Sequence, residues 1–313
     1  MTALIATAPA QLQTASQSLS AQLFARWIAF IDASPKTVST YARNIRHFIA
    51  FINERGITAP TRADIVAYRD YLKESHKAAT VQGYLTSVKL FFRWAQQENL
   101  YPNIADRVKA VRLEAGHKKD YLTSAQTARL LAAIDRSTLQ GLRDYAICAL
   151  MLTTGLREIS VIRADIGDIR TAGDSAALFY QGKGRTEKAD YVKLAPQVED
   201  AIRSYLKARG ESDPSAPLFA ATANRNNGGR MTTRSLSRIA KTRLIAAGLQ
   251  SDRLTGHSFR HTAATLNLLA GGSLEETRQL LGHRSINTTL IYSHALERAA
   301  NNSEQRIAAA IFG

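Results

Sequence analysis

One segment near the C-terminal end of the chain holds side chains that could act on a phosphodiester. Its first motif, H-S-F-R-H, places His257, Arg260 and His261 at positions i, i+3 and i+4, so they share one face of a helix. His283 follows in L-L-G-H, and Tyr292 comes after it. Arginine offers donors that match phosphate oxygens, histidine moves protons near neutral pH, and a deprotonated tyrosine can attack phosphorus. A lone His or Tyr is usually an ordinary residue, but this ordered set predicts phosphoryl transfer.

Helices and turns must position these groups. An apolar run after the first motif predicts a buried helix that ends at residues 271–272, both glycine. A second helix should begin near Leu274 and close at Gly282, which leaves His283 just beyond the cap. A polar turn then leads to a short helix, on which we expect Tyr292 to be exposed.

A second arginine and a lysine lie upstream. A long buried helix is predicted over about 139–152, and T-G-L-R then turns Arg157 out at the start of the next helix. Residues 177–181 and 191–194 are typical of the two strands of a hairpin, and Gly-Lys-Gly around Lys183 opens its turn. A Gly-Lys-Gly alone is often only a turn with a solvated lysine.

The overall charge favours a polyanionic partner. The 313 residues include 41 Lys and Arg against 26 Asp and Glu, a net charge of +15. We expect double-stranded DNA rather than a membrane, since no long apolar run is present, although a merely basic protein is the alternative. The single cysteine, Cys148, suits a reducing cytoplasm, and no Cys/His cluster has the spacing of a metal site, so no metal or cofactor is expected.

Helical periodicity and breaks in it divide the chain. We predict a flexible leader over 1–18, a four-helix bundle over 19–105, a cationic linker over 106–120 and a second domain over 121–313 whose tail is 295–313. The predicted fold is therefore mainly α, with a helical bundle and a mostly helical second domain that contains a small antiparallel β-sheet. No further DNA-binding domain is evident before residue 19.

Basic side chains interleave with the apolar faces and could lie along phosphates. The charged side of a helix is usually just solvated, so each of these positions has an ordinary alternative. The candidate DNA-binding residues in the first domain are Lys36, Arg43, Arg46, Lys89 and Arg93, and those in the second are Arg230, Arg234, Arg238 and Lys241.

The ordered motifs resemble a known family. H-S-F-R-H, L-L-G-H and then Tyr292 resemble the C-terminal signature of the tyrosine recombinases, the phage-integrase and Xer-type family. T-G-L-R is similar to the family's first catalytic arginine motif, Gly-Lys-Gly resembles its hairpin with the catalytic lysine, and the bundle resembles its core-binding domain. The family usually has an acidic residue three positions after the arginine, where this chain has Ser160. That departure leaves open how Arg157 is oriented.

The resemblance implies a cut-and-rejoin reaction on DNA. Tyr292 would attack the scissile phosphodiester and form a 3′-phosphotyrosyl link, which frees a 5′-hydroxyl for attack on the partner strand. The bond energy stays in this link, so neither ATP nor a metal is needed. Arg157 and Arg260 would stabilise the charge of the pentavalent phosphorane, and His283 would hydrogen-bond a phosphate oxygen.

Proton transfer is the remaining part of the implied mechanism. His257 would act with the nucleophile, and Lys183 would protonate the leaving oxygen. Lys188 is the alternative to Lys183, because hairpin registers are easily misjudged by a few residues. A type IB topoisomerase, which rejoins the same strand, and a DNA-binding regulator without chemistry are the rival functions.

Exchange of two duplexes requires four cuts, so we expect a homotetramer on paired DNA sites. The apolar tail includes Ile307, Ile311 and Phe312, which need a burial site. Docking of this tail on a neighbouring protomer would couple Tyr292 to assembly, and the alternative is that the tail folds back on its own domain. Such a protein would act in the cytoplasm, at the nucleoid.

Overall fold

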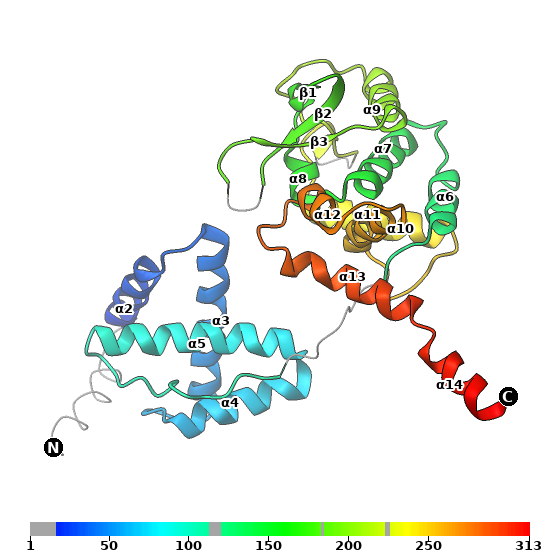
Figure 1. Ribbon diagram of the computed structural model, residues 1–313. Coiled ribbons are helices and arrows are strands. Elements are labelled where there is room, and N and C mark those ends of the chain that lie inside the picture. Colours follow the sequence, from blue (N-terminus) through cyan, green and yellow to red (C-terminus); the bar gives the residue numbers. More distant parts are fainter. Residues whose placement is uncertain (1–16, 113–119, 183–184, 223–225) are drawn as a thin grey trace. The chain divides into compact units, whose positions relative to one another are not determined.

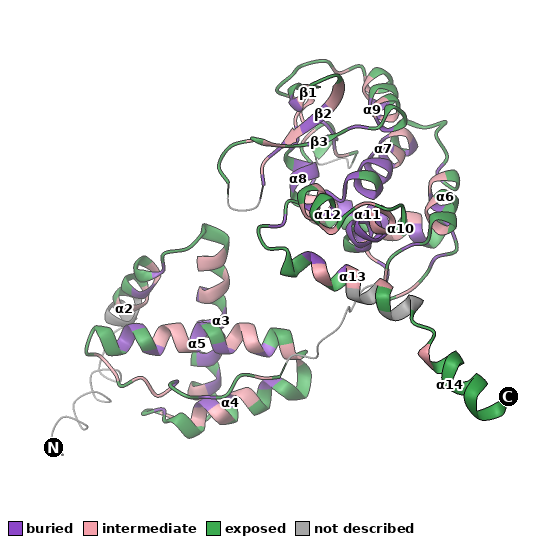
Figure 2. Ribbon diagram, in the orientation of Figure 1, coloured by how far each residue is buried: buried purple, intermediate pink, exposed green. Residues whose placement is uncertain are grey.

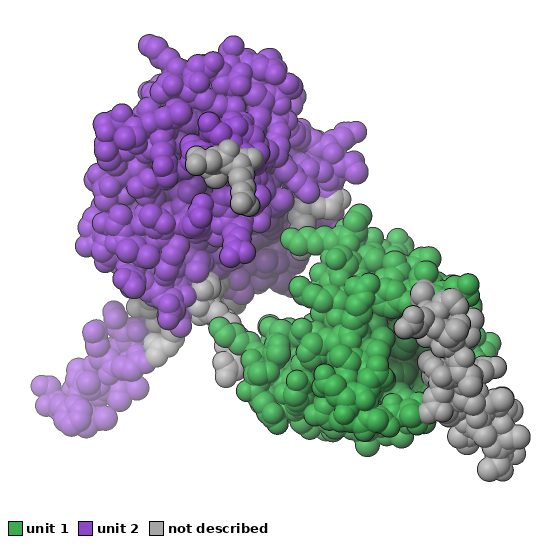
Figure 3. Space-filling model, turned by 180° about the vertical axis from the view of Figure 1, so that it is seen from behind, with its two compact units in different colours: residues 1–115 green, residues 116–313 purple. Residues whose placement is uncertain are grey.

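The computed structural model describes residues 17–112, 120–182, 185–222 and 226–313, with the backbone alone at 17–21, 294–295 and 298–300. The fold is mainly α-helical with one small antiparallel sheet, as predicted (Figure 1). Two compact units divide the chain at residues 115 and 116, and Figure 3 colours them separately. None of the helices in the described ranges is long and apolar enough to cross a membrane.

Within residues 17–112 the first unit has four helices, whose bounds are α2 Gln17–Phe30, α3 Pro35–Glu54, α4 Arg62–Ser75 and α5 Ala78–Gln97. The cap of α3 follows from its sequence: the Ser34 side chain accepts a hydrogen bond from the Thr37 backbone, and Pro35 supplies the first helical residue. Apolar faces of all four helices meet in one core, with Trp27, Phe48 and Tyr68 among its largest fully buried side chains.

The chain after α5 packs against this core beyond residue 106, where the linker was predicted to begin. Ala105 and Val108 are each 2% exposed, and Val111 packs against the same cluster. The Lys89 side chain donates a hydrogen bond of 2.6 Å to the backbone carbonyl of Val108. Much of the segment 106–111 is therefore part of the first unit; residues 113–119 lie outside the described residues, as do residues 1–16 of the predicted leader.

The second unit holds one large core, in which helix α7 (Leu139–Thr154) contributes the longest run of buried residues and α9 (Pro196–Arg209) and α10 (Thr233–Ala246) contribute further ones (Figure 2). The Thr123 and Ser273 side chains cap α6 and α12 in capping boxes, and Gly155 and Gly282 end α7 and α12 in the left-handed conformation. The helices are α6 Ser124–Ala132, α7 Leu139–Thr154, α8 Glu158–Arg163, α9 Pro196–Arg209, α10 Thr233–Ala246, α11 Gly256–Leu269, α12 Leu274–Leu281, α13 Asn287–Ala300 and α14 Ser303–Phe312, with a 3₁₀ turn η1 at Ile166–Asp168.

The sheet has three strands in the order β1-β2-β3, all antiparallel. The predicted hairpin is present as β2, Ser175–Tyr180, and β3, Asp190–Lys193. Strand β1, Ile169–Ala172, and helix α9 were not predicted. β1 is only four residues long, and its pairing with β2 through Ile169 and Leu178, rather than its own pattern, identifies it as a strand.

The last helix extends away from the core of its unit. In α14 Ile307, Ile311 and Phe312 are 58%, 66% and 84% exposed, and Figure 2 shows the helix exposed along its length. The alternative in which the tail folds back on its own domain is therefore not the conformation of this structure.

Candidate active site

Arg260 lies at the centre of the site and joins three helices. Its side chain, on α11, is 4% exposed. One terminal nitrogen, Nη1, donates to the carbonyl of Gly155 at the end of α7 (2.7 Å), and Nη2 donates to that of Leu281 at the end of α12 (2.6 Å). Burial and the charge of Arg157 lower the pKa of Arg260 to about 10, so the guanidinium still carries its charge at neutral pH.

Arg157 approaches the same place from the start of α8, where it is the N-cap residue. Gly155 makes this approach possible: its φ is 63°, and an added Cβ would lie 2.7 Å from the Leu281 side chain. Arg260 donates to the carbonyl of Gly155, two residues before Arg157, and the charge of Arg157 lowers the pKa of Arg260. A phosphate bound between them would turn this repulsion into attraction.

Ser160 stands where the family usually has an acidic residue, three positions after Arg157, and both Ser160 and its neighbour Glu158 bond to other elements. Ser160 is buried and donates its hydroxyl to the carbonyl of Gln181, at the start of the β2–β3 segment (3.2 Å). The carboxylate of Glu158 accepts the hydroxyl of Ser237 on α10 at 2.8 Å. Ser160 has no carboxylate and that of Glu158 is bonded to Ser237, so neither residue takes the place of the family's usual acidic residue.

His283 lies just beyond Gly282, as predicted, and its side chain is buried. Its Nδ1 atom lies 2.9 Å from the hydroxyl of Thr289. Burial lowers the pKa of His283 to about 4, and the charges of Arg260, Arg157 and Arg278 act in the same direction. At neutral pH this imidazole is uncharged, which suits a hydrogen-bond partner better than a second cation.

The prediction that Tyr292 is exposed on a short helix is wrong, because its side chain is only 5% exposed. Helix α13 runs from Asn287 to Ala300, and its residues Thr289 and Tyr292 turn inward one helical turn apart. The Tyr292 ring packs in a cluster with Leu281 and Ala264. Its pKa is raised by burial, and the charges of Arg260 and Arg157 oppose that shift by stabilising the tyrosinate.

A pair of histidine rings adjoins the tyrosine. The His261 ring lies 5.3 Å from that of Tyr292 between centroids, and the His257 ring lies 4.8 Å from that of His261, almost perpendicular to it. His257 is exposed while His261 is 9% exposed. His261 was part of the predicted helical face but had no assigned role; its place four residues after His257 was the available signal.

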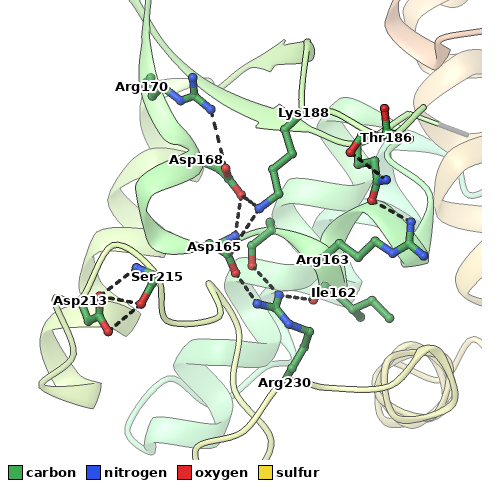
Figure 4. Close-up of polar contacts among 12 residues, drawn as sticks. Ile162, Arg163, Asp165, Asp168, Arg170, Thr186, Lys188, Asp213, Ser215 and Arg230 are labelled. Atoms are coloured by element: carbon green, nitrogen blue, oxygen red, sulfur yellow. Dashed lines mark hydrogen bonds and ion pairs between the residues drawn. The ribbon is translucent and has the colours of Figure 1, made fainter.

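Of the two candidate lysines, Lys188 lies among the described residues. Lys183 lies outside the described residues. The alternative, Lys188, points from the β2–β3 segment toward Asp165 and Asp168 (Figure 4). Its ammonium forms ion pairs with both carboxylates, at 2.6 Å for Asp165, so Lys188 is engaged within its own domain.

The candidate DNA-binding cations fall into two groups. Lys89, Arg230 and Lys241 differ from the expectation of free cations, because each donates to backbone carbonyls of its own unit. Arg230 bonds the carbonyls of Ile162 and Ala164 at the end of α8 and pairs with Asp165. The remaining six candidates have exposed side chains: Lys36, Arg43, Arg46, Arg93, Arg234 and Arg238.

Known proteins match both parts of this chain. Residues 120–298 match the phage integrase family, and residues 22–101 match the phage integrase N-terminal SAM-like domain. Tyrosine recombinase XerC of Herpetosiphon aurantiacus is 30% identical and XerC of Pelobacter propionicus is 31% identical, and the alignments cover 86% and 84% of this chain and 88% and 86% of theirs.

Solved structures share the fold. XerH site-specific recombinase bound to a palindromic difH substrate superposes with a TM-score of 0.72 at 20% identity, over 96% of this chain and 95% of that one. A lambda integrase tetramer bound to a Holliday junction gives a TM-score of 0.67 at 18% identity, over 87% and 76%. With its motifs, its fold and these relatives together, the chain belongs to the phage integrase family and is a tyrosine site-specific recombinase.

Proposed function

We propose that this recombinase cuts and rejoins duplex DNA with Tyr292 as its nucleophile, through a 3′-phosphotyrosyl link. The observation that carries this proposal is that the buried Tyr292 side chain packs against Leu281, whose carbonyl accepts a hydrogen bond from Arg260. The charges of Arg260 and Arg157 also stabilise the tyrosinate, against the effect of burial on the pKa of Tyr292. A phosphate that binds the two arginines would lie close to the tyrosine oxygen. Attack would then form the O–P bond to Tyr292 and break the bond to the 5′-oxygen.

The other side chains would each serve one part of this step. Arg260 is held rigidly by its two backbone acceptors, so its charge is already in place when the phosphorane forms. His283, uncharged at neutral pH, would hydrogen-bond a phosphate oxygen. His257 is exposed and can exchange protons with solvent, which suits it to accept the proton that Tyr292 loses.

Strand exchange is the experiment that tests this function. Two duplexes that carry the same site and different labels should yield hybrid products, and a type IB topoisomerase would rejoin each strand to itself. The reaction should run in EDTA, because the two arginines supply the positive charge that a metal would otherwise provide. Relaxation without hybrid products would favour the topoisomerase, and binding without cleavage would favour the DNA-binding regulator.

We propose Lys183 as the acid that protonates the departing 5′-oxygen. Lys183→Ala should then slow cleavage by roughly 10²–10⁴, because the oxygen must leave as an alkoxide. A substrate with sulfur at the 5′-bridging position leaves as a thiolate and needs no proton, so it should restore the Lys183→Ala rate. The same substrate should not restore Arg260→Ala, whose defect is in charge stabilisation; equal rescue of both variants would contradict the assignment.

DNA would lie against exposed cations of both units. In the first unit Lys36 and Arg43 are seven positions apart on α3 and so share a face, and Arg46 is one turn further on. Arg234 and Arg238 are four positions apart on α10 and share another face. We propose that the first unit, 1–115, is a core-binding domain and that residues 116–313 form the catalytic domain. A protein with this substrate would act at the nucleoid, in the cytoplasm.

We further propose a homotetramer on paired sites, in which α14 docks on a neighbouring protomer. The exposed Ile307, Ile311 and Phe312 support this, because large apolar side chains grouped at a surface mark sites of contact with another protein. The helix follows α13, which carries Tyr292, so docking can influence the nucleophile.

Removal of residues 307–313 should leave binding to a single site unchanged while it weakens cooperative assembly on two sites. Native gel shifts with one-site and two-site DNA measure both, and thermal unfolding of the free protein is the check on folding. Arg306→Gln, on a different face of α14 from Ile307, Ile311 and Phe312, is the matched control and should assemble normally. If the truncated monomer instead loses thermal stability, the tail belongs to its own domain's core.

A further inference from the structure

The segment between β2 and β3 is fixed at its start to α8. Ser160 donates its hydroxyl to the carbonyl of Gln181, and Arg163 donates to the Gln181 side-chain oxygen at 2.8 Å. The Gln181 amide then spans the segment and donates to the carbonyls of Arg185 (2.7 Å) and Thr186 (3.3 Å). One glutamine thus joins the two sides of the segment to each other and to α8.

The far side of the segment is fixed to the residues that follow α8. Lys188 reaches down between Asp165 and Asp168 and pairs with both, as Figure 4 shows. Asp168 is 6% exposed and also accepts the backbone N–H of Asp165 at 2.7 Å, so its carboxylate is held in place. Arg230 pairs with the other oxygen of Asp165 and anchors it to the end of α8.

The contacts of Gln181 and those of Lys188 therefore both fix the segment to one short stretch of chain, which runs from α8 to η1. Arg157 is the N-cap of α8, so whatever fixes the segment to α8 also fixes it relative to that arginine. The segment contains Lys183 in its sequence. A leaving-group acid is effective only when its nitrogen lies within hydrogen-bond reach of the departing oxygen, so attachment of the segment has a direct chemical consequence.

We propose that Lys188, through its ion pairs with Asp165 and Asp168, is a positioning residue that holds the β2–β3 segment so that Lys183 can protonate the leaving 5′-oxygen. This rests on the proposed role of Lys183. Lys188 itself makes a poor acid here, since its ammonium is already shared between two carboxylates, which raise its pKa against the opposing effect of burial. It acts through another residue and does not touch the DNA.

Single-turnover cleavage by Lys188→Met and Lys188→Arg on oxygen and 5′-bridging sulfur substrates tests the proposal. Lys188→Met should cut the normal substrate roughly 10- to 100-fold more slowly, the scale of a misplaced reacting group. It should recover on the sulfur substrate, whose leaving group needs no proton. Lys188→Arg keeps a cation between the two carboxylates and should retain most of the wild-type rate on oxygen. Lys193→Met, an exposed lysine on β3, is the matched control and should cleave normally.

Each outcome separates this proposal from the role of Lys183. If Lys188→Arg is as slow as Lys188→Met while both recover with sulfur, Lys188 is itself the acid. If Lys188→Met is slow on both substrates, or normal on both, it does not position an acid and the proposal fails. If Lys183→Ala is not rescued by sulfur, the proposed function of Lys183 fails instead. Recovery on sulfur also shows that the variant is folded, and thermal unfolding confirms it.

Discussion

Tyr292→Phe should bind its DNA site with unchanged affinity and form no covalent complex with it. The substitution removes only the attacking oxygen, while the ring keeps its packing against His261, Leu281 and Ala264. A nicked suicide substrate, which traps the protein on DNA after cleavage, measures the effect on a denaturing gel. Wild-type protein should give a slow-migrating covalent band, and the variant should give none at any time of incubation.

Tyr180→Phe is the matched control for this loss. Tyr180 is also a buried tyrosine of this site: its hydroxyl lies 3.1 Å from the point where a Cβ on Gly282 would stand. Burial raises its pKa, and the charges of Arg260 and Arg157 oppose that shift. It should keep the covalent band, because it is not the nucleophile. A band that persists in Tyr292→Phe and disappears in Tyr180→Phe would move the nucleophile from α13 to β2.

The fold followed from the sequence where local signals determine structure. Ser34 and Pro35 start α3, the Ser273 capping box starts α12, and Gly282 ends it, all as short-range chemistry requires. β1 had no such signal, because its pairing with β2 is what makes four residues a strand. Helix α9 was missed although it does carry local signals, with Pro196 in its first turn and Gly210 at its end.

The site was predictable in its residue types but not in its burial. Arg260 was recognised from its motif, yet its two acceptors lie 105 and 21 positions away, at Gly155 and Leu281. Arg230 was taken for a free cation because its acceptors Ile162 and Ala164 lie on a helix 66 or more positions upstream. The burial of Tyr292 likewise depends on how α13 packs against α11, which no spacing within α13 can specify.

Arg260→Ala should lower the cleavage rate by roughly 10²–10³, the scale for the loss of one preorganised transition-state donor. Binding should fall much less, because the exposed cations still contact phosphates. The carbonyls of Gly155 and Leu281 would lose their donor, at a cost of roughly 1–3 kcal/mol for an unsatisfied buried group, so thermal unfolding must be measured alongside. Arg203→Ala, an exposed arginine on α9 paired with Glu199, is the control and should cleave normally.

The pH dependence separates a catalytic Arg260 from a merely structural one. Its positive charge stabilises the tyrosinate of Tyr292 and so lowers the pKa of that hydroxyl, against the effect of burial. Removal of the charge should raise this pKa, and the limb over which cleavage increases with pH should move to higher pH in Arg260→Ala. A variant that loses binding and cleavage in equal proportion, with an unchanged pH profile, would show that Arg260 anchors the bound DNA and does not stabilise the transition state.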